Sequence, residues 1–453
     1  MGPRFRNVDR QTPMLLPPDL REWVGEDDLV HFVIEAVERV PLSGFRVNVK
    51  GCGDAQYPPH MMLSLLIYCY ANGMFSSRRI ERATYRDVAV RYLTADTHPD
   101  HDTISEFRRW NLGAIAEAFV GVLELARELK LLKVGTVSVD GTHLKASASK
   151  DQNVTYERAQ QLREQLRLDI DQLLQKAEAA DVQEEDPQQL PKELARRQKL
   201  LAKMDEACAR LEERARQRAA REQEEYERKV AAREEREGSA KGRHIKAPEW
   251  TPPPDEQINL SDADAGLMRK NKREGYTQSY NAQAVVDAGG SQLIVGQRIS
   301  LCASDAGELE PDLGSIPAAV GKPEQVLADC GYVDGEVFER IADQGGPELY
   351  VSVHREDAHS ERRYEYRPSR RIKPPKKITD PRLLAMQEKL RTESGRARYR
   401  LRAQTVEPVF GIIKQGMGFR QFLLRGLAKV SGEWTLVCLA YNLKRLQKLA
   451  QAA

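Results

Sequence analysis

A long charged segment, residues 155–237, constrains most strongly how this chain can fold. The segment is almost free of glycine and proline, and in its first half leucine and isoleucine recur at helical spacing, interrupted by Pro187 and Pro191. This pattern predicts an α-helical hairpin or coiled coil. Beyond Leu211 the apolar positions thin out, which indicates a solvated or partly disordered helix. Because strand-like sequence lies on both sides, we interpret the segment as an insertion into an α/β unit.

The sequence around the insertion alternates between strand and helix patterns. Short apolar runs bounded by turn residues predict strands, and Gly289-Gly290 predicts a hairpin turn between two of them. Their order predicts an α/β fold with a mixed sheet and helices packed on it. The predicted strands are residues 134–139, 280–287, 292–299, 325–328 and 348–353, with helices after residue 308 and at 335–343.

The N-terminal part of the chain has a helical pattern throughout. Thr103 and Glu106 form a capping-box pattern before a long helix. Short helices with basic first or last turns are typical of helix-turn-helix DNA-binding domains, so Arg108 and Arg109 are candidate DNA contacts. A plain helical bundle with solvated arginines is the alternative. The predicted regions are a helical domain for DNA binding or dimerisation at 1–130, the first part of the core at 131–154, the insertion and its linker at 155–255, and the rest of the core with a basic C-terminal region at 256–453.

Charge is distributed unevenly along the chain. The net charge is only +2, from 70 Lys and Arg against 68 Asp and Glu. Residues 361–430, however, hold 19 basic and 6 acidic side chains, whereas residues 151–240 hold 18 basic and 22 acidic ones. We therefore expect basic residues in 362–377 and 389–425 to contact DNA phosphates, with a solvated basic face as the alternative.

Aromatic residues are interleaved with basic ones near the C-terminus. Arg420 and Arg425 flank Phe419 and Phe422. Positive charge beside aromatic rings is typical of surfaces that bind nucleic acid by stacking. We therefore predict Arg420 and Arg425 as DNA contacts.

Several classes of protein are excluded by the sequence. The six cysteines are scattered without a CxxC pair, which argues against a zinc knuckle and against a secreted disulfide framework. The longest apolar stretch, residues 61–75, is too short and mixed to span a bilayer. The first residues contain no apolar core of a signal peptide. We therefore expect a cytoplasmic protein with no membrane partner.

Three carboxylates occupy positions suited to chemistry. Asp140 ends the first predicted strand, Asp329 ends a later parallel strand, and Glu407 lies on a helix with Lys414 two turns further along the same face. Ligands collect at the carboxyl ends of strands in open α/β sheets. Three converging carboxylates would need a cation, and oxygen ligands suit Mg²⁺ or Mn²⁺. Two such ions would serve an in-line phosphoryl displacement. Taken singly, a strand-end aspartate is more often a turn or cap, and a helical glutamate is more often solvated.

At these positions the chain resembles the DDE transposases of bacterial insertion sequences, whose catalytic core is ribonuclease-H-like. Val139-Asp140-Gly141-Thr142 resembles the strand with the family's first aspartate. Asp329-Cys330-Gly331-Tyr332 resembles its second motif, typically D-x-G-Y. The family's Tyr-Arg-Glu-Lys signature is similar to Tyr399, Arg402, Glu407 and Lys414.

The resemblance implies a role for each of these residues. Asp140, Asp329 and Glu407 would be catalytic and would hold two Mg²⁺ or Mn²⁺ ions. Lys414, Tyr399 and one of two arginines would contact DNA near the cleavage site. The arginine is either Arg402 or Arg400.

The spacing of this signature departs from its commonest form. Arg402 lies five residues before Glu407 instead of four. Arg400, seven residues before Glu407, shares its helix face better. The arginine that contacts DNA therefore stays open between the two.

The resemblance also implies an activity and partners. The protein would bind the terminal inverted repeats of its element, cut them and join the freed 3′-hydroxyl to target DNA, as a homodimer or higher homo-oligomer in the bacterial cytoplasm. We interpret the insertion as a dimerisation or end-pairing element. Two alternatives are a catalytically silent DNA-binding or regulatory protein derived from a transposase, and a ribonuclease-H-fold nuclease without strand transfer.

Other polar residues rank lower as site residues. His143 would face the metal site or pack on the strand. We expect Asp334 to cap a helix, Asp287 to lie in the hairpin turn and Asp305 to lie in a loop. Either Asp287 or Asp305 could instead support the metal ligands.

Overall fold

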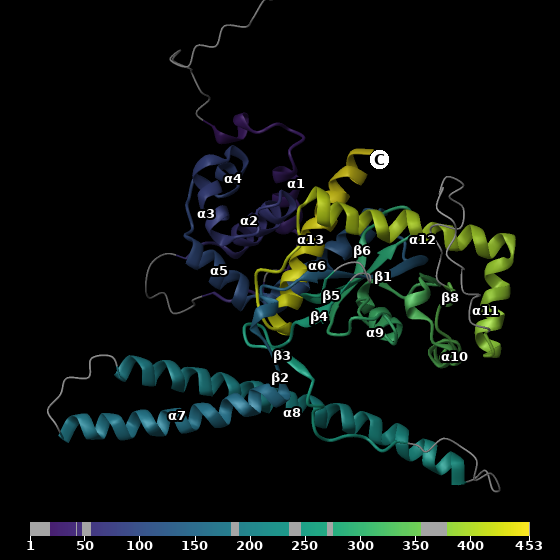
Figure 1. Ribbon diagram of the computed structural model, residues 1–453. Coiled ribbons are helices and arrows are strands. Elements are labelled where there is room, and N and C mark those ends of the chain that lie inside the picture. The colour runs from purple at the N-terminus through teal and green to yellow at the C-terminus, as the bar shows by residue number, and fades with distance from the viewer. Residues whose placement is uncertain are drawn as a thin grey trace, which may run out of the picture.

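The computed structural model describes residues 19–41, 43–47, 56–182, 190–234, 246–269, 275–354 and 378–452. Figure 1 shows an α/β protein in which helices flank a mixed sheet and a long helical hairpin projects to one side. The predicted α/β class with a mixed sheet is therefore confirmed. The basic stretch 362–377 lies outside the described residues. No helix in the described part of the chain is long and apolar enough to cross a membrane.

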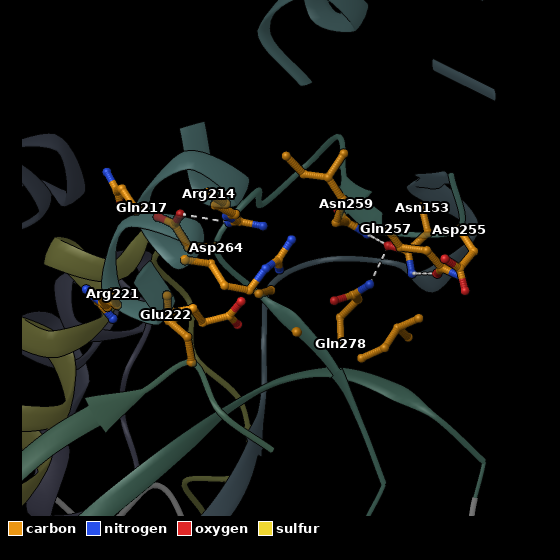
Figure 2. A pocket seen from close by; sticks show the side chains of 16 residues that line it. Asn153, Arg214, Gln217, Arg221, Glu222, Asp255, Gln257, Asn259, Asp264 and Gln278 are labelled. Carbon is orange, nitrogen blue, oxygen red and sulfur yellow. Dashed lines mark hydrogen bonds and ion pairs between the residues drawn. The ribbon is translucent and has the colours of Figure 1, made fainter. Parts of the chain in front are cut away.

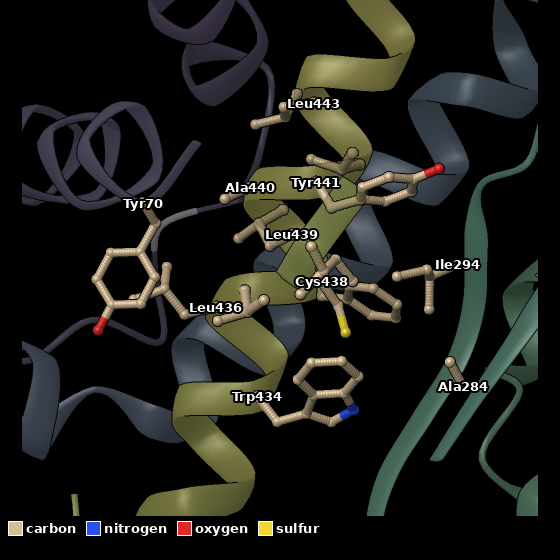
Figure 3. Close-up of a cluster of buried hydrophobic side chains, with 14 of the residues drawn as sticks. Tyr70, Ala284, Ile294, Trp434, Leu436, Cys438, Leu439, Ala440, Tyr441 and Leu443 are labelled. Atoms are coloured by element: carbon tan, nitrogen blue, oxygen red, sulfur yellow. The ribbon is translucent and has the colours of Figure 1, made fainter. Parts of the chain in front are cut away.

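In the described residues that precede the sheet there are six helices, and these helices share a core with the sheet. The C-terminal helix α13 (Leu427–Ala452) packs against α2 and α6, so the N-terminal helices and the sheet share one core. Figure 3 shows α13 between Tyr70 of α2 and the sheet residues Ala284 and Ile294. The six helices are α1 (Leu29–Glu38), α2 (Pro59–Ala71), α3 (Ser77–Arg86), α4 (Val88–Leu93), α5 (His101–Trp110) and α6 (Leu112–Glu128), after a 3₁₀ turn at Leu20–Trp23.

The sheet is built around its longest strands, β1 (Thr136–Lys145) and β5 (Thr277–Asp287), which pair antiparallel. β6 (Ile294–Ser300) and the short β4 (Gly266–Met268) both pair antiparallel with β5. On the other side of β1, β7 (Gln325–Ala328) and β8 (Glu348–Val351) continue the sheet in parallel. The predicted aspartates Asp140 and Asp329 directly follow the paired residues Val139 of β1 and Ala328 of β7.

The first strand is longer than predicted. Asp140 was expected to end it, but β1 continues to Lys145 because β5 offers backbone partners as far as Ser279. Only the parallel pairing with β7 ends here, at Val139 opposite Ala328. Asp140 therefore lies inside a strand, at the point where its parallel neighbour stops.

The charged insertion forms two long helices, α7 (Tyr156–Val182) and α8 (Leu190–Glu234), above a two-stranded ribbon of β2 (Asn153–Thr155) and β3 (Gln257–Asn259). α8 extends well past α7 (Figure 1) and stays helical to Glu234, so the predicted partial disorder beyond Leu211 is not observed over these residues. Ala215 and Ala219 are buried there. The hairpin has its own small core, which includes Val154, Leu166, Met204, Cys208, Leu211 and Ile258.

Helix α12 (Glu393–Gly411) carries the predicted glutamate across the parallel strands. It packs against β1, β7 and β8, and continues into a π-helical turn, Ile412–Gly416. Pro408 lies inside α12 and has no N–H for the carbonyl of Gln404, which accepts instead from Gln292 Nε2 at 2.8 Å. The remaining helices are α9 (Leu309–Gly314), α10 (Gly335–Asp343) and α11 (Pro381–Arg391), with 3₁₀ turns at Lys150–Gln152, Ala318–Val320 and Cys330–Tyr332.

Aspartates cap several of these elements. Asp334 accepts from the backbone N–H groups of Glu336 and Val337 and caps α10, as predicted. Asp287 accepts from Ser291 in the β5–β6 turn, also as predicted. α5, in contrast, begins at His101 and is capped by Asp100, so the predicted cap at Thr103 is wrong.

Candidate active site

Strand register places Asp140 and Asp329 side by side. Val139 of β1 pairs in parallel with Ala328 of β7, and each aspartate is the next residue. Asp140 accepts from the N–H of Gly141 at 2.8 Å. Asp329 accepts from the N–H of Gly331 at 2.7 Å and caps the 3₁₀ turn that follows. The two predicted aspartates are therefore brought together, and Asp329 is a cap as well.

The Asp140 carboxyl is held in an environment that disfavours its charge. Burial, together with the negative charges of Asp329 and Asp305, raises the pKa of Asp140 from 3.8 to about 7. The Arg402 guanidinium and the Gly141 N–H oppose this increase. Closely spaced carboxylates that resist ionisation are typical of functional sites.

Asp305 is a third carboxylate at this edge. From the sequence it was predicted to lie in a loop, with support of the metal ligands as the alternative. Its Oδ1 accepts from Asn281 Nδ2 at 2.9 Å and from Gln283 Nε2 at 2.7 Å. A Cβ placed on Gly331 would lie 3.2 Å from Asp305 Oδ2. Asn281 and Gln283 lie on one face of a buried strand, and this pair of amides was the sequence signal for a polar site.

Arg402 connects the aspartates to Glu407. Its guanidinium is buried, with Nη1 at 3.5 Å from Asp140 Oδ2 and Nη2 at 3.2 Å from Glu407 Oε1. Glu407 itself is 55% exposed and reaches the aspartates through this arginine. Arg400 is exposed to solvent, as Glu407 is, whereas the buried Arg402 is the arginine that contacts Glu407. Residues five apart lie on different faces of an α-helix. The Arg402 side chain is long enough to reach Glu407 across this difference.

The carboxylates fit a divalent cation in chemistry. All of them offer oxygen atoms, which Mg²⁺ and Mn²⁺ prefer. The raised pKa of Asp140 reflects repulsion that a bound cation would relieve. As the side chains lie, however, no group of three or more His, Cys, Asp or Glu among the described residues could hold a metal ion. The positively charged group that pairs with both Asp140 and Glu407 is the Arg402 guanidinium.

Two family models match the chain. A model of a transposase DDE domain matches residues 361–447, which include Glu407, and a model of a transposase domain (DUF772) matches residues 18–110. The two matches support an insertion-sequence DDE transposase. No curated protein and no solved structure gives a significant match to it.

Lys414 contacts β1 two and three residues beyond Asp140. From the π-helical turn its ammonium donates to Thr142 Oγ1 and to the carbonyl of His143, at 3.2 Å from the latter. Single-turn π-helical segments occur frequently at functional sites. The His143 ring lies 3.2 Å from the carbonyl of Ala303, in the loop that carries Asp305. His143 therefore contacts the site through its neighbouring loop.

The predicted DNA contacts near the C-terminus differ in exposure. The exposed Arg420 donates to the carbonyl of Lys414, and the exposed Arg425 donates to the carbonyl of Ser147. Phe419 and Phe422 are fully buried, so the predicted stacking of bases on them is wrong. Tyr399 lies on α12 one turn before Arg402, whose guanidinium carbon is 6.0 Å from the Tyr399 ring centroid.

Arg108 does not fit the predicted role in DNA binding. Its side chain is buried, 4% exposed, and donates to Tyr70 Oη at 2.7 Å and to the carbonyl of Phe75 at 3.1 Å. Tyr70 in turn lies 3.4 Å from a carboxylate oxygen of the buried Glu433 on α13. Arg108 therefore joins the N-terminal helices to the core, and only its neighbour Arg109 is exposed.

A cavity of about 780 Å³ lies between α8 and the strands β3 and β4 (Figure 2). Its lining contains none of the predicted catalytic residues. Arg214 pairs with Asp264 there, and Arg218 pairs with Glu256. These two ion pairs join α8 to the segments on either side of β3.

Gly141 provides a test of how tightly this site is packed. A Cβ at this position would collide with Asp305 and Gln283, and would lie 2.7 Å from Asn281 Oδ1. Gly141→Ala is expected to lower the free energy of unfolding by about 1–3 kcal/mol, measured by urea denaturation. Gly135→Ala is the control, because nothing lies within 4 Å of the added atom, and it should be neutral or slightly stabilising. Equal stabilities of the two variants would contradict this packing.

Proposed function

We propose that this transposase cuts DNA at the terminal inverted repeats of its element and joins the freed 3′-hydroxyl to target DNA. Asp140, Asp329 and Glu407 are the proposed catalytic residues. The observation that carries the proposal is the register of β1 and β7, which sets two aspartates of distant segments side by side. It is supported by α12, which brings Glu407 across the same strands.

The proposal includes a ribonuclease-H-like core. Support comes from a mixed sheet whose central strand, β1, carries Asp140 and pairs in parallel with the strand that leads to Asp329. The transposase DDE match over residues 361–447 supports it independently. The helical insertion enters this core between β1 and β5 and leaves their pairing intact.

Two divalent ions, Mg²⁺ or Mn²⁺, are the proposed cofactors, with Asp140, Asp329 and Glu407 as their ligands. The chemistry that such ions supply is stabilisation of the negative charge on the attacking and leaving oxygens of a phosphoryl displacement. Arg402 lies between Asp140 and Glu407, and its positive charge opposes the increase in the pKa of Asp140 that burial causes. Asp305 is fixed by two amide donors and packs closely against Gly141 and Gly331.

The basic side chains around the carboxylates are the proposed DNA contacts. Guanidinium and ammonium groups bind phosphate oxygens and dominate affinity for DNA. Arg420 and Arg425 are exposed and already oriented by bonds to backbone carbonyls. The other proposed DNA contacts are Tyr399, Arg400, Arg402, Lys414 and Arg109.

We also propose that the α7–α8 hairpin pairs two subunits, because two DNA ends must be held together for transposition. Support comes from leucines that the hairpin leaves exposed, namely Leu168, Leu174 and Leu200. Deletion of residues 155–237 is expected to reduce the mass of the DNA complex in light scattering while single-end binding persists. An unchanged mass would contradict this role.

The test of the activity uses a DNA fragment with both ends of the element, a target plasmid, and Mg²⁺, Mn²⁺ or EDTA. Wild-type protein is expected to release the fragment and insert it, only with a divalent ion present. A protein with Asp140→Asn, Asp329→Asn and Glu407→Gln combined is the control against contaminating nucleases. It should bind the ends without cutting them.

The same assay separates the alternatives. Binding of the ends by wild-type protein without cutting would support a regulatory DNA-binding protein and overturn the proposal. Cutting without joining would support a nuclease instead. Cutting by the combined variant at the wild-type rate would show that the three carboxylates are not the catalytic groups.

A further inference from the structure

The exposed side of helix α3 is unusually basic for its length. Arg78, Arg79, Arg82 and Arg86 are all exposed, and so is Tyr85, with 57% of its surface accessible. We propose that these five residues, the α3 face, bind the backbone of duplex DNA. This inference rests on the proposed function, because it adds a second contact surface for the same DNA.

Helix stability does not account for these arginines. Arg82 has another arginine three residues before it, and one four residues to each side, and like charges at these spacings destabilise a helix. Arg78 and Arg79 lie in the first turn, where the helix dipole disfavours positive charge. The polyanionic DNA backbone would offset both kinds of repulsion.

Neighbouring carboxylates do not account for them either. None of the four arginines forms an ion pair with a residue that the structure describes. Glu81 is the acidic residue of α3, and its carboxylate lies 2.9 Å from His101 Nδ1. The α3 face therefore presents four positive charges to solvent, and this complements phosphate.

The α3 face is also held rigidly. Ile80, Ala83 and Thr84 are buried on the opposite side of the helix. The Tyr85 ring stacks on His98, with centroids 3.9 Å apart, and His98 Nδ1 lies 3.1 Å from Thr84 Oγ1. The Tyr85 ring is thus fixed, and it lines a shallow pocket together with Arg78 and Arg82. Tyrosine hydroxyls are common phosphate contacts. Less conformational entropy is lost when such a surface binds.

The start of α3 adjoins the active-site region. Phe75, two residues before the helix, packs on Phe419 with ring centroids 5.1 Å apart. Phe419 immediately precedes Arg420, a proposed DNA contact that donates to the carbonyl of Lys414. A duplex that runs from the carboxylates past Arg420 would therefore meet the first turn of α3. The geometry points to one continuous DNA track over both parts of the chain.

The test compares DNA binding by two matched variants of the full chain. The first replaces Arg78, Arg82 and Arg86 by glutamine. The control removes the same number of exposed arginines from the acidic insertion, at Arg196, Arg216 and Arg228. The probe is a fluorescein-labelled duplex of mixed sequence, followed by anisotropy over a series of salt concentrations with EDTA present, so that binding is measured without cutting.

We expect the α3 variant to bind DNA roughly 10- to 100-fold more weakly. The slope of the logarithm of the binding constant against the logarithm of the salt concentration should be less steep by about 2–3, because each arginine removed would lose about one phosphate contact. The control variant should bind like wild type. Thermal unfolding should show both variants folded, with the α3 variant no less stable because repulsion is relieved. Tyr85→Phe is expected to weaken binding by a smaller factor without changing the salt dependence.

Unchanged affinity and salt dependence of the folded α3 variant would overturn this inference, and so would an equal loss in the control. The outcome is distinguishable from failure of the proposed function, because binding is measured without divalent ions. At saturating DNA the α3 variant should still cut the ends. If the wild-type protein cuts DNA but the α3 variant binds DNA normally, the proposed role of the α3 face is refuted and the proposed function is not.

Discussion

Asp329→Asn is expected to lower the rate of DNA cleavage by at least about 10²–10³-fold, because it removes one of two adjacent carboxylates that would hold the catalytic cations. Asp140→Asn should have an effect of the same size, since strand register makes the two residues equivalent neighbours. Asp305→Asn should lower the rate less, by about 10–100-fold. Its carboxylate accepts hydrogen bonds from Asn281 and Gln283 and would support the metal ligands rather than hold the ions directly.

The measurement is single-turnover cleavage of a preformed DNA complex started with Mn²⁺, so that changes in affinity do not enter the rate. Asp334→Asn is the matched control. Asp334 follows Asp329 by five residues but caps α10, and asparagine caps a helix about as well as aspartate. A rate for Asp305→Asn as low as that for Asp329→Asn would make Asp305 a ligand in its own right. A wild-type rate for Asp329→Asn would remove Asp329 from the catalytic set.

Local patterns in the sequence were enough for much of the fold. β7 and α10 begin and end at the residues predicted for them, because a short apolar run and a helix with an aspartate cap are both specified by neighbouring residues. The proximity of Asp140 and Asp329 followed from the same reasoning, since ends of parallel strands meet at one edge of a sheet.

Features that depend on distant segments were not predictable in this way. Asp305 is drawn to the site by two amides on β5, and nothing in its own loop indicates this. Arg108 and Arg109 are neighbours in the last turn of α5, yet one is buried against Tyr70 and the other is exposed. Sequence shows that an arginine ends a helix, but only packing decides which side of that helix is covered. Phe419 was misjudged for the same reason.

Asp140→Asn is also expected to stabilise the metal-free protein, by about 2–4 kcal/mol at a pH of about 8. The pKa of Asp140 is about 7 in the folded state against 3.8 for an ordinary aspartate, so the folded state binds the proton more tightly than the unfolded state. Ionisation of this carboxyl therefore destabilises the fold. The destabilisation is absent below a pH of about 4, grows as the pH rises and is complete above about 7.

Urea denaturation with EDTA, followed by tryptophan fluorescence, measures this effect. The wild-type protein should lose stability relative to Asp140→Asn as the pH is raised from about 4 to about 8, and the two should converge at the acidic end. Carboxyls remote from this site titrate equally in both proteins and therefore cancel in the difference. Asp334→Asn should track wild type throughout. Equal stabilities at every pH would mean that Arg402, 3.5 Å away, already balances the Asp140 charge in the folded protein.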